Sequence, residues 1–100
     1  MATELKKVVK KRLKKPNRFQ VILLNDDYTT MEFVVEVLMR FFGKTTEAAH
    51  ALMLKIHIEG EAVCGVYSHD VAQTKVSQVI DFSRKNEQPL MCILREIEDA

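Results

Sequence analysis

Hydrophobic positions change their spacing several times along the chain, and each spacing predicts a different element. Residues 19–24 alternate and then become continuously apolar, which predicts a strand, and the polar residues 25–27 predict a turn behind it. Apolar residues at helical spacing predict a helix over residues 30–42, with Gly43 supplying a left-handed stop.

A second helix is predicted from Thr45 or Thr46, either of which could cap it, to the region before Gly60. Its short connection to the first helix predicts a helical hairpin. Residues 62–67 are continuously apolar, which is typical of a strand covered on both faces and so predicts a central position in the sheet.

The third helix begins after Ser68 or Asp70 and continues to about Lys85, and residues 90–94 form a last strand after Pro89. The predicted order is therefore β-α-α-β-α-β. This order indicates an α+β fold, a single compact domain in which helices pack mainly on one face of a small antiparallel sheet.

Two capping boxes are predicted at helix starts, because a hydroxyl or carboxylate followed three residues later by Glu or Gln can satisfy two free backbone N–H groups. Thr29 with Glu32 would begin the first helix in this way. Asp70 with Gln73 would begin the third.

Charge divides the chain into two parts. Residues 1–18 hold eight Lys or Arg side chains and one Glu, a net charge of +7, so residues 19–100 carry −6 of the total of +1. Like charges repel and stay solvated, which predicts a basic flexible N-terminal arm over 1–18 and a core domain over 19–100. The arm could instead form an amphipathic helix against a partner, through Leu5, Val8, Val9 and Leu13.

Composition excludes several classes of protein. A chain of 100 residues with 47% hydrophobic side chains forms one core and cannot also enclose a large cofactor, so no cofactor is expected. No apolar run approaches the roughly 20 residues that span a bilayer, and no secretion signal precedes the lysines. Cys64 and Cys92 lie in apolar runs without metal-ligand spacing, so we expect core thiols and a cytoplasmic location.

His50 and His57 also argue against a metal site, because two helical turns place them about 10 Å apart. A cysteine nucleophile would need an exposed thiol with a base beside it. Neither requirement is indicated by the positions of the two cysteines.

The turn at residues 25–27 is the candidate site. Its carboxylates could serve only the turn and the following helix dipole, or they could form a rim that binds a cation. Apolar residues at the near ends of the helical hairpin favour the second interpretation, because they could close a pocket beside the rim: Met31, Met53, Ile56 and the neighbouring His57. A peptide's free N-terminus with a large hydrophobic first side chain would suit such a pocket.

The residues that form this candidate site also resemble a known family. The stretch VILLNDDYTTMEFV at 21–34 resembles the signature of the ClpS adaptors, which deliver N-degron substrates to the bacterial Clp ATPase and its peptidase. Further segments follow in family order: LMLKIH at 52–57, CGVY at 64–67, AQTK at 72–75 and PL at 89–90. The resemblance implies a non-enzymatic, monomeric adaptor whose partners are the ATPase N-terminal domain and substrates beginning with Leu, Phe, Tyr or Trp.

The resemblance also implies roles for individual residues. Asn25, Asp26 and His57 would contact the α-amino group. The side-chain pocket would comprise Thr29, Met31, Val34, Met53, Ile56 and Leu90, with Met31 excluding β-branched residues. The face for the ATPase would comprise Tyr28, Asp70, Thr74 and Lys75. This chain departs from the family's usual residues at Thr30 (proline), Ile56 (valine) and Gln73 (glutamate).

Two alternatives belong to other classes. A basic arm on a small domain is also found in RNA-binding or ribosome-associated modules, although the acidic core argues against phosphate binding. An enzyme would need a titratable pair in a cleft, and only Asp26 with His57 could provide one. His57 could also do no more than cap the last carbonyls of its helix.

Overall fold

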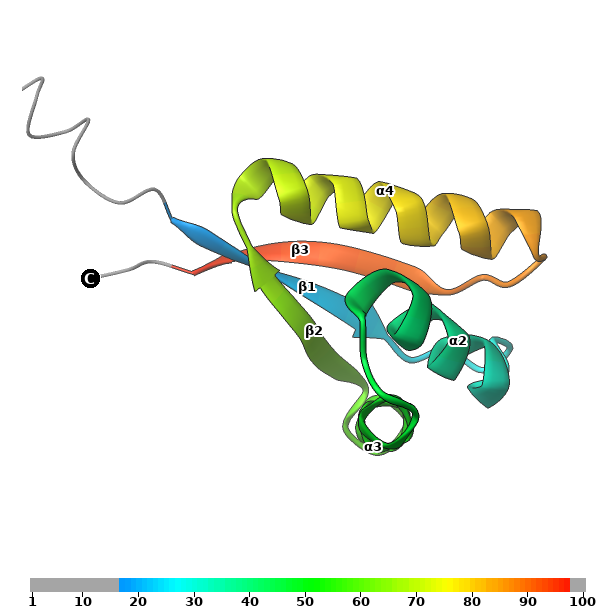
Figure 1. The fold of residues 1–100 in the computed structure, drawn as a ribbon. Coiled ribbons are helices and arrows are strands. Elements are labelled where there is room, and N and C mark those ends of the chain that lie inside the picture. The colour runs from blue at the N-terminus through cyan, green and yellow to red at the C-terminus, as the bar shows by residue number, and fades with distance from the viewer. Residues whose placement is uncertain (1–16, 98–100) are drawn as a thin grey trace, which may run out of the picture.

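The computed structural model describes residues 17–97 and contains a three-stranded sheet and three helices (Figure 1). Their order confirms the predicted α+β arrangement. Apart from Asn17 and Arg18, the predicted arm lies outside the described residues, and Arg18 is already the first residue of a strand. The elements are β1 (Arg18–Leu24), α2 (Met31–Phe42), α3 (Thr46–Glu59), β2 (Glu61–Tyr67), α4 (His69–Lys85) and β3 (Met91–Ile97).

The sheet has the order β2-β1-β3 and is antiparallel throughout. The predicted central position of residues 62–67 is therefore wrong, because β1 lies in the centre and β2 at an edge. Val63 and Val66 are 37% and 41% exposed, on the face that the helices leave open. An apolar run looks the same whether its outer face is covered or open, which is why the sequence misplaced this strand.

An ion pair joins the two edge strands on the open face. Arg95 of β3 and Glu61 of β2 approach to 3.1 Å across β1. Arg95 pairs with Gln20 of β1, and Glu61 pairs with Leu24 of β1. Gln20 and Leu24 flank Ile22 on the same side of the strand. Ile22 is fully buried, so the bridge and the paired strands cover the centre of this face.

Helix starts differ in part from the predicted caps. Thr30, not Thr29, is the N-cap of α2, and its hydroxyl accepts the Phe33 N–H at 3.1 Å. Thr45 caps α3 in the same way. The second predicted box is also wrong, because Ser68 occupies the N-cap position of α4 without a side-chain cap bond and Asp70 lies in the first turn.

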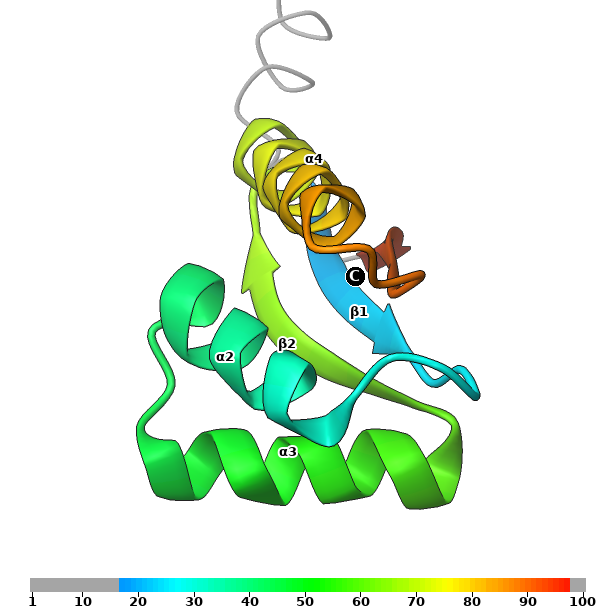
Figure 2. The same ribbon diagram turned by 90° about the vertical axis from the view of Figure 1, so that its right-hand side faces the viewer.

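The α2–α3 hairpin brings the start of α2 beside the end of α3 (Figure 2). Gly43 ends α2 with φ of 61° and Gly60 ends α3 with φ of 92°, conformations that suit glycine because it lacks Cβ. The Asn25 N–H donates to the Gly60 carbonyl at 2.8 Å, which ties the end of β1 to the end of α3. Three segments of the chain therefore meet at one place.

The hairpin and α4 share one hydrophobic core with the inward face of the sheet. Its fully buried members include Val21, Leu23, Val37, Leu38 and Val79. Burial of several such side chains, each contributing about 1.5–3 kcal/mol, holds the helices in position around the place where the three segments meet. None of the helices in residues 17–97 is long and apolar enough to cross a membrane.

Candidate functional site

A pocket of about 250 Å³ opens where the loop after β1, the start of α2 and the end of α3 meet. Eight of the nine residues predicted to bind the amino group or the first side chain line it. The polar lining residues are Asn25, Asp26, Asp27, Thr29 and His57, and the apolar ones are Met31, Val34, Met53 and Ile56. The pocket thus has one polar side and one apolar side.

Asp26 is held in place by its own turn. Its Oδ1 accepts the backbone N–H groups of Tyr28 at 2.8 Å and Thr29 at 2.7 Å, and its Oδ2 accepts the Thr29 hydroxyl at 2.6 Å. Burial raises the pKa of Asp26, but the Thr29 hydroxyl, these backbone bonds and the charge of Arg84 outweigh it and lower the pKa below its ordinary value. The carboxylate therefore stays charged.

The same bonds limit what Asp26 can offer a ligand. A carboxylate has about four acceptor positions, and three of them are occupied. Asp26 therefore supplies negative charge and about one free acceptor. The turn interpretation and the cation-rim interpretation are compatible, since the turn bonds fix the charge at the pocket's edge.

Asn25 and His57 differ from Asp26 in being free to bind. Within the part of the chain that the structure describes, neither side chain makes a hydrogen bond to protein. The suggested capping role of His57 finds no support, because the Gly60 N–H bonds the Ile56 carbonyl at the end of α3. An amide oxygen and an imidazole nitrogen therefore stand beside the charged carboxylate with unused acceptor capacity.

Apolar side chains form the interior of the pocket. Val34, Met53 and Ile56 are 7%, 9% and 2% exposed and belong to the core, so this wall is rigid. Met31 is 47% exposed, which rules out a core methionine and places its flexible thioether at the surface of the pocket.

Leu90 is the predicted pocket residue that does not line the pocket. It is 1% exposed and lies in the core, immediately before β3, where its carbonyl accepts a bond from Arg84 at 3.1 Å. Its assignment to the side-chain pocket stays a prediction.

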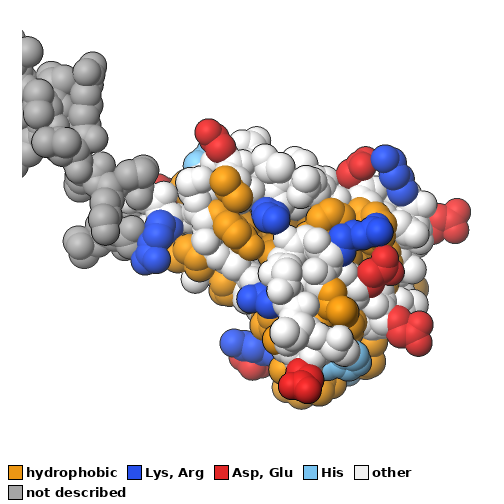
Figure 3. Space-filling view, viewed as in Figure 1, with side chains coloured by type: hydrophobic (Ala, Val, Ile, Leu, Met, Phe, Trp, Pro, Cys, Tyr) orange, Lys and Arg blue, Asp and Glu red, His pale blue; other side chains and the backbone are white. Residues whose placement is uncertain are grey.

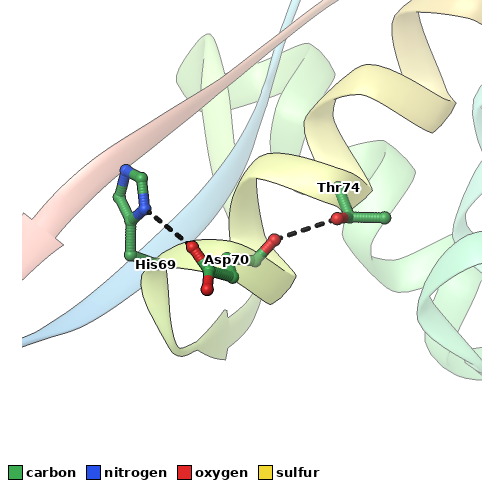
Figure 4. Close-up of polar contacts among 3 residues, drawn as sticks. All are labelled: His69, Asp70 and Thr74. Atoms are coloured by element: carbon green, nitrogen blue, oxygen red, sulfur yellow. Dashed lines mark hydrogen bonds and ion pairs between the residues drawn. The ribbon is translucent and has the colours of Figure 1, made fainter.

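The residues assigned to an ATPase face fall into two groups. Asp70, Thr74 and Lys75 lie on the first turns of α4, and Figure 4 shows the Thr74 hydroxyl donating to the Asp70 backbone carbonyl at 2.9 Å. The Asp70 carboxylate is fully exposed, with His69 Nδ1 3.4 Å away. Lys75 Nζ donates to the Phe41 carbonyl at 2.7 Å, so this lysine also caps the end of α2.

Tyr28 is not beside the other three. It is 81% exposed on the loop that follows Leu24, whereas Asp70 follows Tyr67. Leu24 pairs with Glu61 and Tyr67 with the far end of β1, so the two groups lie at opposite ends of a seven-residue strand, about 20 Å apart. Tyr28 and Asp70 are therefore separated along the sheet, and their assignment to one docking face stays a prediction.

Sequence reasoning also missed the contribution of the end of α4 and of the α4–β3 connection. Arg84, in the last turn of α4, lowers the pKa of Asp26 through its charge, and the Gln88 side-chain oxygen accepts the Thr30 N–H at 3.2 Å. Gln88 and Thr30 are 58 positions apart in the sequence, and no local pattern indicates their contact. Asp27, which was considered as part of the turn and of a possible rim, lines the pocket too.

The described residues give no support to a cysteine nucleophile or a metal site, whereas the titratable pair that an enzyme would need, Asp26 and His57, does line one pocket. Cys64 and Cys92 are both buried, and burial raises their pKa values to about 11 and about 12, so neither is a nucleophile at neutral pH. No group of His, Cys, Asp or Glu side chains within residues 17–97 could hold a metal ion. The face in Figure 3 intersperses acidic with basic side chains and offers no continuous basic surface for a phosphate backbone.

Comparison with known proteins points to one family. Residues 14–93 match the family described as "ATP-dependent Clp protease adaptor protein ClpS". Proteins named ATP-dependent Clp protease adapter protein ClpS are 60% identical over 82 residues in Albidiferax ferrireducens and 58% over 85 in Alkalilimnicola ehrlichii. These alignments cover 82% and 85% of this chain and 68% and 80% of the two relatives.

A solved structure has the same fold. Agrobacterium tumefaciens ClpS2 bound to L-phenylalaninamide superposes with a TM-score of 0.81 at 35% sequence identity. The match covers 83% of this chain and all of that one. The sequence and the fold therefore indicate the same family.

Proposed function

The chain belongs to the ClpS family of ATP-dependent Clp protease adaptors, and we propose that its pocket binds the free N-terminus of N-degron substrates. The first residue of such a substrate is Leu, Phe, Tyr or Trp. The adaptor then delivers the substrate to the Clp ATPase and its peptidase for degradation, without itself catalysing a reaction or using a cofactor.

One observation carries this proposal: acceptors for an ammonium group stand at the edge of an apolar pocket. Asn25 and His57 have unused acceptors, and Asp26 adds a fixed negative charge with about one more. An α-ammonium group has three protons to donate and one positive charge. The number of acceptors and the sign of the charge both match it.

The apolar side of the pocket supports the choice of first residue. Val34, Met53 and Ile56 form a buried apolar wall. Contact with this wall stabilises a bound hydrophobic side chain by about 25 cal/mol for each Å² of apolar surface removed from water. L-phenylalaninamide, the ligand of the Agrobacterium ClpS2 structure, has an α-amino group beside an aromatic side chain. A ligand of that chemistry suits both sides of this pocket.

Met31 gives the pocket a means of selection. Its side chain borders the opening and is half exposed, so a branch at the Cβ of the first residue would meet it. Leu and the aromatic residues have a single substituent on Cβ, whereas Ile and Val have two. Met31 therefore favours Leu or an aromatic first residue over Ile or Val.

Docking on the ATPase N-terminal domain is assigned to Asp70, Thr74 and Lys75, supported by the exposure of Asp70 and the closeness of the three on α4. Tyr28 would contact the same domain from the other end of the sheet. The basic arm, residues 1–18, would engage the ATPase as well. The adaptor would act as a monomer in the cytoplasm.

Peptides that differ only in their first residue test this function. With a dye at the C-terminus, peptides beginning with Leu, Phe, Tyr or Trp should bind at about micromolar affinity or better, and those beginning with Ala, Ser or Glu at least about tenfold more weakly. Fluorescence anisotropy measures both. Equal affinity for all first residues would contradict the proposal, and binding of single-stranded RNA in preference to every peptide would favour the RNA-binding alternative.

A further inference from the structure

A second hollow continues the pocket along the helical hairpin. It has a volume of about 200 Å³ and lies between α2 and α3, lined by Met31, Glu32, Val35, His50 and Met53. Met31 and Met53 also line the pocket, so the two hollows share a wall. We name this second hollow the side groove.

The side groove lies on the far side of the pocket from the ammonium acceptors. Helix α2 runs away from the loop that carries Asn25 and Asp26, so Val35 is farther from that loop than Met31. Helix α3 runs the opposite way, so His50 is farther than Met53 from His57 (Figure 2). The hairpin therefore presents ammonium acceptors, pocket and side groove in that order.

The spacing along α2 from Met31, which lines both hollows, to Val35, which lines only the side groove, matches the repeat of an extended peptide. Val35 lies one helical turn beyond Met31, about 6 Å along α2. Side chains on the same face of an extended chain are two residues and about 7 Å apart. A peptide with its first side chain in the pocket and its chain directed along the hairpin would place its third side chain, not its second, over the side groove.

We infer that the side groove binds the third residue of the substrate, an inference that rests on the proposed N-terminus binding. Its lining is apolar apart from Glu32 and His50, which favours an aliphatic side chain there. His50 Nδ1 lies 3.1 Å from the Thr46 carbonyl, so it donates to that oxygen and the neutral ring keeps no N–H for a ligand. Glu32 disfavours a carboxylate and tolerates a long basic side chain with an apolar stem.

Peptides of the form Phe-Ala-X and Phe-X-Ala, each extended by the same neutral sequence and a C-terminal dye, test this inference at pH 7.5. X is Leu, Lys, Ser or Asp. The peptide with Leu at the third position should bind the protein about five- to tenfold more tightly than the peptide with Asp at that position. The same exchange at the second position should change affinity less than about twofold. An equal or larger effect at the second position would overturn the inference.

Two pairs of variants locate the effect on the protein. Glu32→Lys should reduce the preference for Lys over Asp at the third position by at least about threefold, whereas Glu36→Lys, the same change on the same helix outside the groove, should not. Val35→Thr should weaken the preference for Leu over Ser, whereas Val71→Thr on α4 should leave it intact. Equal behaviour within either pair would overturn the assignment to this groove.

The failure of this inference is distinguishable from failure of the proposed function. If peptides bind only with a free amino group but the third residue has no effect, the side groove is not a subsite and the pocket assignment stands. If acetylated and free peptides bind equally, the pocket assignment fails and the inference fails with it.

Discussion

Asp26 would serve both folding and, under the proposed function, recognition. Three hydrogen bonds from Tyr28 and Thr29 hold its carboxylate, and they lower its pKa despite partial burial. Asparagine and aspartate before a helix are common for structural reasons alone, so the sequence could not decide between turn and site. The structure shows that the turn bonds leave the charge at the pocket's edge.

The pKa of Asp26 gives a prediction about acid stability. Because the pKa is lower in the folded than in the unfolded chain, the stabilisation is present at neutral pH and is lost as pH falls through the folded pKa, below the ordinary value of about 3.9. Thr29→Val removes the hydroxyl bond and should move the pKa of Asp26 upward, so that loss begins at higher pH. Carboxyl titration by NMR measures the shift, and an unchanged pKa would contradict the account.

His57 leads to a prediction about binding of the amino group. His57→Ala removes one of the unused acceptors beside the charged Asp26 carboxylate, at about 1–3 kcal/mol for a charge-assisted bond, so affinity for a Phe-initiated peptide should fall by about tenfold or more. Calorimetry on the native protein and on His57→Ala measures the loss.

His50 is the matched control for this substitution, because it is the other histidine on α3 and does not line the pocket. With Ala at the peptide's third position, His50→Ala should keep the native affinity. An unchanged affinity in His57→Ala would remove His57 from the site.

Met31 gives a prediction about selectivity. Met31→Ala should admit peptides that begin with Ile or Val, because the side chain that meets the extra β-substituent is gone. Since Met31 is 47% exposed, the substitution should cost less than about 1–2 kcal/mol, below the 2–5 kcal/mol of a buried methionine. The ratio of Leu-first to Ile-first affinity and a thermal melt measure the two effects; a large loss of stability with unchanged selectivity would contradict the assignment.

At the level of elements, the hydrophobic spacing predicted all three helices and all three strands in the right order. The errors concern details that spacing does not contain. Thr29 and Thr30 both satisfy the pattern of a cap, and only the bond from Thr29 to Asp26 explains why Thr30 caps α2. β2 is apolar on both faces although one of them is open, so its sequence could not reveal an edge strand.

The caps themselves can be ranked by measurement. Thr30→Ala and Thr45→Ala each remove a side-chain cap bond and should cost about 1 kcal/mol of unfolding free energy. Ser68→Ala removes no such bond and should cost less than about 0.5 kcal/mol. Urea denaturation gives the three values, and an equal cost for Ser68→Ala would contradict the observed geometry of α4.

At the level of the whole molecule, the site is assembled from three segments that the hairpin brings together. The sequence predicted most of this assembly because the hairpin itself is a local feature: its two free ends must lie near the loop after β1. It could not predict the burial of Leu90 or the separation of Tyr28 from Asp70, because both depend on which strands are neighbours. The influence of Arg84 on Asp26 depends on the same tertiary arrangement.

The distance between the pocket and the proposed docking residues predicts that peptide binding and delivery to the ATPase can be separated. Asp70→Arg changes an exposed charge at the end of the sheet opposite the pocket, so peptide affinity should stay within about twofold of the native value. Degradation of a Leu-initiated reporter by the Clp ATPase and its peptidase should fall by at least about fivefold. Asp81→Arg, farther along α4, is the matched control. With this variant the reporter should be degraded at the native rate.

Calorimetric titration of one Phe-initiated peptide, with a free and with an acetylated amino terminus, tests the central claim most directly. Acetylation removes the positive charge and donors that Asn25, Asp26 and His57 would bind, at about 1–3 kcal/mol for each lost charge-assisted bond. The free peptide should therefore bind at about micromolar affinity or better, and the acetylated peptide should give no measurable heat at the same concentrations. Equal affinity for the two peptides would contradict the assignment of this pocket to the substrate's N-terminus.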